Sequence, residues 1–275
     1  MESTNVPPNE ALALDLSCQN IETLPEWVRA HTGLRGLDLS WCPNLKNLPS
    51  WIGELQSLRV VCLSASGIQA LPAEIGQLKQ LKRLYLIQCR QLSRLPNTLG
   101  DLSSLTYLDL TKSGITELPA SIGALTQLTE LNMCGCVQFT ELPDSTCDLL
   151  NLSRINLSGT RIARLPDKFG NLKKLAYLAL NGCENLATLP DSLGGLELLE
   201  EIHLEKSAIV TLPASVANLT KLITLNLDAC DKLVALPDAF SAMPDLTRVT
   251  VPITAAMLPS LCANNRLRTA RFFSN

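Results

Sequence analysis

Cysteine is the residue of this chain whose spacing could support chemistry. Five of its ten cysteines recur at a fixed interval of 47 residues: Cys42, Cys89, Cys136, Cys183 and Cys230. Thiolates bind zinc and take part in redox reactions. A zinc site needs about four ligands around one point, however, whereas a fixed interval along the chain indicates copies of one structural unit. We therefore interpret the five thiols as structural groups that face inward and satisfy backbone groups of a turn.

The two histidines do not complete a catalytic arrangement. His31 falls in a turn, and His203 falls on an expected strand between Glu201 and Glu205. The sequence contains no G-x-S-x-G, H-E-x-x-H or phosphate-binding glycine motif. We expect a protein without enzymatic activity, and no metal or cofactor is implied.

Disulfides are not expected among the cysteines. Cysteines of the 47-residue series would lie two strand spacings apart, about 10 Å, whereas a disulfide needs Cα atoms within about 7 Å. Cys62 and Cys134 are predicted at outward strand positions, too far apart to pair. Free thiols are typical of a reducing compartment, and the first ten residues lack the apolar segment of a signal peptide. We expect a cytoplasmic protein.

A second series on the same interval divides each 47-residue unit in two. Ser66, Ser113, Thr160 and Ser207 fall halfway between the cysteines. The half that contains Ser113 reads L-x-x-L-x-L-x-x-S-x-I-x-x-L-P-x-x-I-G-x-L, and the half that contains a cysteine differs by one extra residue just after it. The halves are therefore 23 and 24 residues long.

This pattern predicts a solenoid of short parallel strands. In L-x-x-L-x-L the fourth and sixth residues are two apart, so both point to the same side of a strand. One strand cannot bury its apolar side alone, but stacked repeats build a continuous core. We predict an α/β repeat solenoid, a horseshoe with about 11 strands on the concave face and short helical or 3-10 segments on the convex face. The predicted divisions are a polar extension over 1–10, ten repeats over 11–245, and a final strand with a C-terminal cap over 246–275.

Charge and hydropathy exclude several classes of partner. The net charge is −3 and the acidic and basic residues are interspersed. No apolar stretch approaches the length of a membrane span. We therefore expect no binding to nucleic acid or to a membrane. We expect a monomer that binds a protein partner.

The outward residues of the strands are the predicted binding surface. They are basic in the early repeats, aromatic and polar in the middle, and acidic in the late repeats. All three tyrosines fall on this face, and tyrosine is a favoured anchor at protein interfaces. The alternatives are the helical side, with Trp27 and Trp51, and the lateral loops. The predicted partner-binding residues are Arg35, Trp41, Arg59, Arg83, Tyr85, Tyr107, Asp109, Asn132, Arg154, Asn156, Tyr177, Glu201, His203, Glu205 and Asp228.

The repeating unit resembles that of intracellular leucine-rich repeat proteins with an L-P-x-x-I-G signature. These include Ras-pathway scaffold proteins, plant intracellular Ras-group proteins, and repeat domains of plant resistance proteins and bacterial effectors. The resemblance covers about 240 of the 275 residues and implies a non-catalytic protein-recognition scaffold. An alternative remains open: a ligand-sensing or substrate-recruiting arm of a larger signalling protein, immune receptor or effector enzyme. An effector would be delivered into a host cell.

Overall fold

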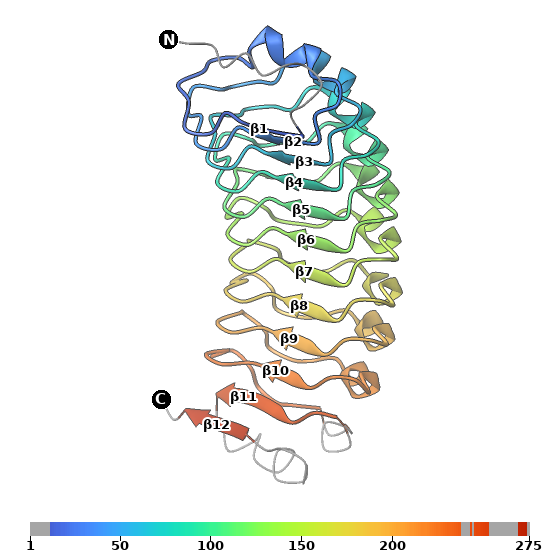
Figure 1. Cartoon of the computed structure of the whole chain (residues 1–275). Coiled ribbons are helices and arrows are strands. Elements are labelled where there is room, and N and C mark those ends of the chain that lie inside the picture. The colour runs from blue at the N-terminus through green and yellow to red at the C-terminus, as the bar shows by residue number, and fades with distance from the viewer. Residues whose placement is uncertain (1–11, 238–242, 244, 253–268, 274–275) are drawn as a thin grey trace. The chain divides into compact units, whose positions relative to one another are not determined.

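A computed structural model describes residues 12–237, 243, 245–252 and 269–273 of the chain. The chain divides into two compact units, the first ending at Leu128 and the second beginning at Thr129. Within each unit, short parallel strands are stacked on one side and 3-10 helices on the other (Figure 1). The repeat solenoid predicted from the sequence is confirmed.

The strands of the first unit pair in chain order, all parallel and in register. Each repeat contributes one strand and one 3-10 helix. The strands are β1 (Ala13–Asp15), β2 (Gly36–Asp38), β3 (Val60–Cys62), β4 (Arg83–Tyr85) and β5 (Tyr107–Asp109). The helices are η1 (Glu26–Ala30), η2 (Ser50–Glu54), η3 (Ala73–Gln77), η4 (Asn97–Asp101) and η5 (Ala120–Ala124).

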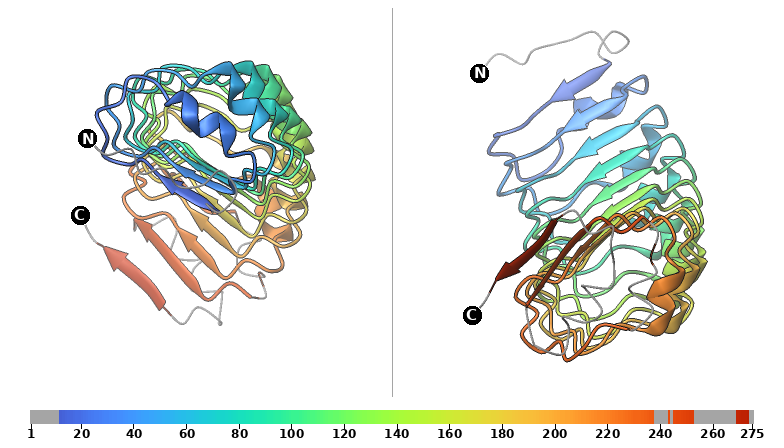
Figure 2. Two further views of the ribbon diagram at one scale, coloured as in Figure 1. Left: turned by 45° about the horizontal axis from the view of Figure 1, so that its top comes forward. Right: turned by 90° about the horizontal axis from the view of Figure 1, so that it is seen from below.

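The second unit continues the same pattern, again with parallel strands paired in chain order (Figure 2). Its strands are β6 (Glu130–Asn132), β7 (Arg154–Asn156), β8 (Tyr177–Ala179), β9 (Glu201–His203), β10 (Thr224–Asn226), β11 (Arg248–Pro252) and β12 (Thr269–Phe273). Its helices are η6 (Asp144–Asp148), η7 (Phe169–Asn171), η8 (Asp191–Gly195) and η9 (Ala214–Asn218).

The predicted terminal segments lie partly outside the described residues. The extension over 1–10 is outside them. In the segment 246–275, β11 is the predicted final strand, and β12 pairs in parallel with it. This additional strand had not been expected, because the leucine spacing that marks the other strands is lost there.

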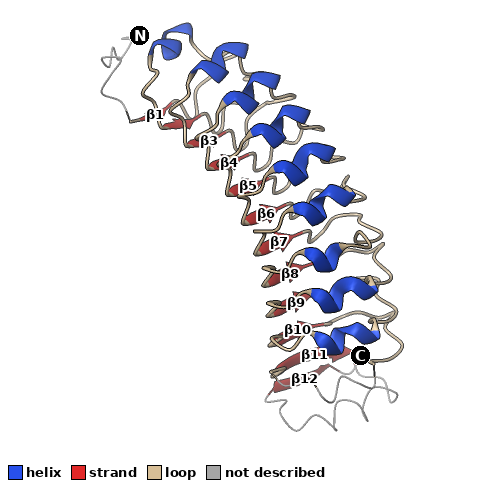
Figure 3. Ribbon diagram, turned by 90° about the vertical axis from the view of Figure 1, so that its right-hand side faces the viewer, coloured by secondary structure: helices blue, strands red, loops and turns tan. Residues whose placement is uncertain are grey.

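The repeat motif forms this fold because its leucines fit the buried side of a strand and its proline fits the start of a 3-10 helix. In β4 the middle residue, Leu84, is fully buried, as is Leu86 just after it, while the residues on either side of Leu84 face outward. The proline that follows leucine then starts the helix: Pro119 has φ −65° and its carbonyl accepts the N–H of Ile122 at 2.9 Å. Proline fixes φ near this value. Figure 3 shows the helices on the side of each unit opposite the strands.

The cysteine series lies inside the solenoid, as the sequence predicts. The Sγ of Cys89, Cys183 and Cys230 each donates a hydrogen bond to a backbone carbonyl 26 residues earlier, at 3.1, 3.3 and 3.0 Å. All three side chains are fully buried. In the shorter half-repeats a hydroxyl takes this position, and Thr160 Oγ1 donates to Leu157 O at 2.7 Å. The thiols are therefore structural donors to the turns.

The residue before each of these inward positions has a left-handed backbone. At Gly135, Gly159 and Gly182 φ is 73°, 69° and 65°. Elsewhere the position is occupied by residues with side chains, among them Trp41 at φ 59°. A side chain in this region costs roughly 1–2 kcal/mol relative to the right-handed form. The turn therefore imposes strain wherever the residue is not glycine.

The other cysteines are only partly where the sequence placed them. Cys62 ends β3 and is half-buried, with its Sγ 2.9 Å from Ser40 Oγ. Cys134 was predicted on a strand but lies two residues beyond β6, in the left-handed turn, where it is half-buried. Cys18 is exposed, which the sequence did not single out. All the described cysteines are free; Cys262 lies outside the described residues.

Candidate functional site

The sheet face of each unit consists of the outward residues of its strands and the residues immediately beside them. All fifteen predicted positions lie there. Arg35 and Arg59 directly precede β2 and β3, while Trp41, Glu205 and Asp228 lie in the turns after strands. The other ten lie on strands: Arg83, Tyr85, Tyr107, Asp109, Asn132, Arg154, Asn156, Tyr177, Glu201 and His203.

In the first unit, four cations form what we call the basic row: Arg35, Arg59, Lys82 and Arg83. The first three occupy the same position before successive strands, because the Arg59 N–H donates to Arg35 O and the Lys82 N–H donates to Arg59 O. Such positions are about 4.8 Å apart. All four side chains are exposed, and none forms an ion pair or hydrogen bond with a described residue. The basic row therefore carries positive charge that the described chain does not neutralise.

Beside the basic row, Tyr85 and Tyr107 form an aromatic pair. Their ring centroids are 5.2 Å apart and the rings are tilted by 44°. The hydroxyl of Tyr107 donates to Asp109 Oδ2 at 2.8 Å, and Asp109 Oδ1 accepts the backbone N–H and the hydroxyl of Thr111. Asp109 is only 4% exposed. It therefore holds Tyr107 in place, and its carboxylate faces other groups of the chain.

Trp41 is the most prominent apolar side chain beside the sheet face of the first unit. It is 61% exposed and follows β2 in the left-handed turn. The left-handed backbone at Trp41 is a property of the turn in every repeat, whereas the exposure of a large aromatic side chain is particular to this one. The sequence predicted Trp41 at the edge of this face, which agrees with its position in the structure.

In the second unit, three side chains from successive strands form what we call the aromatic stack: Arg154, Tyr177 and His203. The guanidinium carbon of Arg154 lies 4.0 Å from the ring centroid of Tyr177. The Tyr177 ring also contacts the ring of His203, and the two ring centroids are 5.2 Å apart. His203 Nε2 is 2.9 Å from Glu201 Oε2. These contacts fix four predicted residues in one cluster.

Asparagine side chains at the ends of strands form hydrogen bonds that stabilise the turns after those strands. Asn132 Oδ1 accepts the N–H of Cys134 at 3.1 Å, and Asn156 Oδ1 accepts the N–H of Ser158 at 3.0 Å. Strand β8 ends in Ala179, and there Asn181 Oδ1 accepts the N–H of Glu205. The oxygens of these amides are thus used within the chain, as in other turns built on asparagine. Sequence reasoning missed Asn181, although its place two residues beyond β8 matches that of Glu205 beyond β9.

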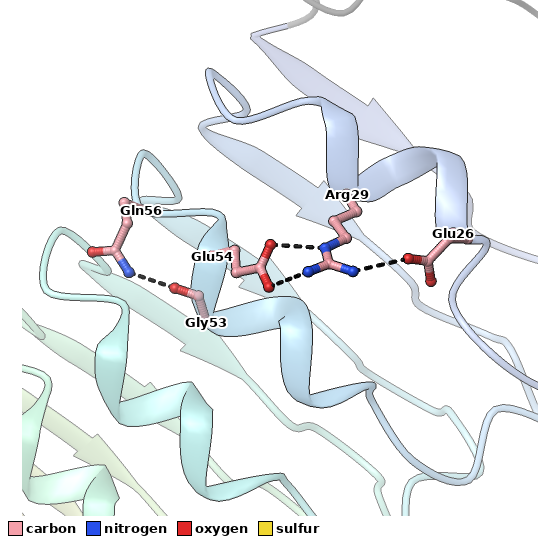
Figure 4. Close-up of polar contacts among 5 residues, drawn as sticks. All are labelled: Glu26, Arg29, Gly53, Glu54 and Gln56. Carbon is pink, nitrogen blue, oxygen red and sulfur yellow. Dashed lines mark hydrogen bonds and ion pairs between the residues drawn. The ribbon is translucent and has the colours of Figure 1, made fainter.

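The helical side of the first unit contains a cluster of paired charges. Arg29 donates to both carboxylate oxygens of Glu54, from Nε at 2.7 Å and from Nη2 at 2.6 Å, and it also contacts Glu26 (Figure 4). These hydrogen bonds hold the pKa of Glu54 below its usual range. Gln56 donates to Gly53 O on the same side. Two further ion pairs away from the sheet face also join successive repeats: Arg94–Glu117 and Lys173–Glu197.

The lateral turns of the second unit contain a depression of about 590 Å³. Its floor is Ser207 and Ala208, both buried, in a shorter half-repeat. Its sides come from the longer turns before and after it, each with one extra residue. The lining is charge-balanced, since Glu184 and Asp231 face it together with Lys206 and Lys232. No class of ligand is favoured by this lining.

Neither a cluster of metal ligands nor a membrane-spanning helix occurs in the part of the chain that is described. No group of three histidine, cysteine or acidic residues is placed to hold a metal ion there. None of the described helices has the length and apolar character needed to cross a bilayer.

Comparison with known proteins assigns the family. A family model described as a leucine-rich repeat region matches residues 14–106 and 167–272, more than half of the chain. The chain is a leucine-rich repeat protein. Proteins of this kind generally mediate protein–protein interaction, are typically non-catalytic, and use an extended face of the solenoid for binding. Comparison with curated protein sequences gives no match.

Solved structures similar to this leucine-rich repeat protein come from varied sources. The leucine-rich repeat domain of the type III effector XopL is 27% identical, with a TM-score of 0.64 over 88% of this chain and 76% of that one. An internalin of Listeria monocytogenes is 17% identical, with a TM-score of 0.64 over 98% and 88%. The plant peptide hormone receptor RGFR1, solved in complex with RGF2, is 24% identical, with a TM-score of 0.53 over 89% and 52%. The last two similarities establish the fold alone.

Proposed function

We propose that this leucine-rich repeat protein is a non-catalytic recognition scaffold that binds a protein partner on its sheet face. One observation carries the proposal: each unit presents half-exposed aromatic side chains beside arginines that have no ionic partner among the described residues. In the first unit these are Tyr85 and Tyr107 beside Arg83, and in the second unit Tyr177 beside Arg154.

The physical reason is that these groups are ordered before binding. Rings held by neighbouring rings and by Asp109 lose little conformational freedom when a partner covers them. Tyrosine and arginine are the side chains that most often dominate interface energies. On the helical side, by contrast, Arg29 is already satisfied by Glu54. A partner therefore gains more at the sheet face than at the helical side.

The charge of the first unit favours a partner with an acidic segment. The side chains of the basic row form no ion pair with a described residue, and unpaired charges of one sign steer partners of the opposite sign and raise association rates. An acidic segment of a partner is the complement of this surface. In the second unit Glu200, Glu201 and Asp228 add negative charge near β9 and β10.

We propose that the protein is intracellular. We also assign its repeats to the L-P-x-x-I-G type. The sequence signature and the free thiols of the described cysteines support the intracellular setting. A second candidate is a recruiting arm of a larger protein. The similarity to XopL favours it, because that structure is itself a domain of an effector.

Site-specific photocrosslinking tests which surface binds. A benzophenone side chain is placed at Tyr85, Tyr177, Trp27 or Glu184, one position per variant, which samples the two sheet faces, the helical side and the lateral depression. Protein adducts are expected from the positions at Tyr85 and Tyr177. Adducts obtained only from Trp27 or Glu184 would place the partner elsewhere and refute the proposal.

A further inference from the structure

Arg154 presents a charged hydrogen-bonding group that the described chain leaves unused. It is the first residue of β7 and is exposed. Its guanidinium lies over the ring of Tyr177 at 4.0 Å, but no hydrogen bond or ion pair joins it to a described residue. Stacking on an aromatic ring restricts the orientation of a guanidinium while leaving its N–H groups at the edge available. Arg154 is therefore a preoriented donor.

Tyr177 is fixed in this position from both sides. Arg154 lies beside it on β7 and His203 on β9, and these residues come from adjacent strands in register. His203 is in turn held by Glu201 at 2.9 Å. Burial, together with the nearby Glu201 carboxylate, raises the pKa of Tyr177 despite the opposing effect of Arg154. The phenol thus stays neutral and able to donate at neutral pH.

Asn156 supplies a third polar side chain on the same sheet face. It lies on β7 two residues after Arg154, on the same face of the sheet. Its Oδ1 accepts the N–H of Ser158, which orients the amide and leaves Nδ2 without a hydrogen bond to a described residue. Its register partner on β8 is Ala179, a small residue that is 1% exposed.

We propose that Arg154, Tyr177 and Asn156 form a binding site for a carboxylate group of the protein partner. The inference deepens the proposed function and rests on it, because the carboxylate is a feature of the bound protein. It comes from an aspartate or glutamate side chain or from a C-terminus. A planar guanidinium edge matches a carboxylate with two parallel hydrogen bonds.

The surrounding charge selects a carboxylate over a phosphate group. Glu130 is the register partner of Arg154 on β6, and Glu201 lies beyond Tyr177. These two carboxylates repel a phosphate, which carries nearly two negative charges, more strongly than a carboxylate with one. Neutralising Glu130 is therefore expected to strengthen binding of the carboxylate.

The site can be tested with small probes and without knowing the partner. NMR of the arginine Nε–Hε groups in the full chain is recorded during titration with four capped amino acids. N-acetyl-aspartate methylamide carries a side-chain carboxylate, and N-acetyl-alanine carries a terminal one. N-acetyl-asparagine methylamide is the neutral control, and N-acetyl-phosphoserine methylamide supplies the phosphate.

A saturable shift of the Arg154 signal is expected with at least one carboxylate, and the stronger of the two identifies its source. Asparagine is expected to give none, and phosphoserine a weaker response. Arg154→Lys removes the arginine signal, so binding to this variant is followed at the side-chain amide of Asn156. It should be about tenfold weaker, the effect of losing one charge-assisted hydrogen bond, whereas Glu130→Gln should tighten binding. Arg161→Gln, an exposed arginine of the same unit outside the sheet face, is the matched control and should change nothing.

Two results would overturn the carboxylate site. One is the absence of a saturable Arg154 shift with either carboxylate while thermal unfolding shows an intact fold. The other is an equal shift with the asparagine probe. In either case crosslinking of a partner at Tyr177 still decides the proposed function separately, since that experiment does not depend on the carboxylate.

Discussion

The thiol of Cys89 donates a hydrogen bond to the backbone carbonyl of Leu63, 3.1 Å away and 26 residues earlier in the chain. The same relationship joins Cys183 to Leu157. A small donor that faces inward thus links one repeat to the preceding one, and the 47-residue interval of the cysteines reflects this role. Burial removes water from the thiol and raises its pKa, which affects both its labelling rate and the stability of the fold at high pH.

Labelling rates should separate the buried thiols from the accessible ones. Burial raises the pKa of Cys89 to about 11 from an ordinary 9.0, so its thiolate fraction near neutral pH falls about 100-fold. Cys18 should react first with a maleimide, followed by Cys62 and Cys134, as followed by peptide mass spectrometry over time. Rapid modification of Cys89 or Cys183 in the folded protein would contradict the inward orientation.

Stability should decrease in alkaline solution for the same reason. Burial raises the pKa of both Cys89 and Cys147 to about 11. The unfolded chain therefore releases these protons at lower pH than the folded chain. A raised pKa in the folded state contributes stability that is complete below about pH 9 and is lost as pH rises toward 11. Urea unfolding at pH 8 and pH 10.5 measures this, and Cys89→Ser should reduce the difference between them.

Asp109 should tolerate substitution by asparagine but not by alanine. Its oxygens accept hydrogen bonds from Tyr107 and Thr111, and asparagine performs the equivalent role at Asn132 and Asn156. Asp109→Ala leaves a buried N–H without its acceptor and should cost about 1–3 kcal/mol. Asp109→Asn should cost less than half of that in urea unfolding. Equal losses for the two variants would show that the hydrogen bonds do not matter.

Trp41→Gly should separate stability from recognition. The left-handed φ of 59° favours glycine, so removing the side chain should relieve roughly 1–2 kcal/mol of strain in the folded turn, less the conformational entropy that glycine adds to the unfolded chain. Binding of a partner on the sheet face of the first unit should weaken at the same time. Gly182→Ala, at the equivalent turn with φ 65°, is the opposite control and should destabilise. A Trp41→Gly variant that keeps full affinity would remove Trp41 from the interface.

The fold could be read from the sequence because its signals are local and repeated. The leucines two residues apart, the Leu-Pro step and the following Ile-Gly-x-Leu segment mark the strand and the 3-10 helix of nearly every repeat. The same register placed all three tyrosines on the sheet face. The strain at Trp41 was also within reach, since Gly135, Gly159 and Gly182 occupy the same position in later repeats.

Other features depend on side-chain conformation, which periodicity does not determine. Outward spacing alone could not show that Asp109 is buried and accepts the hydroxyl of Tyr107. Nor could it show that the Arg154 guanidinium lies over the Tyr177 ring and forms no ion pair with its register partner Glu130. Cys134 was assigned to a strand because the motif does not mark where β6 ends. Strand β12 lacks the motif altogether, so only the structure shows it.

Partner capture by tyrosine variants tests the proposed recognition surface most directly. The wild-type chain, a variant with Tyr85, Tyr107 and Tyr177 each replaced by alanine, and a Trp27→Ala control on the helical side are used as baits, and recovered proteins are quantified by mass spectrometry. A partner recovered with the wild type and with Trp27→Ala should be lost at least tenfold with the triple variant, equivalent to about 1.4 kcal/mol. Undiminished recovery by a triple variant that unfolds at the wild-type temperature would contradict binding through the sheet face.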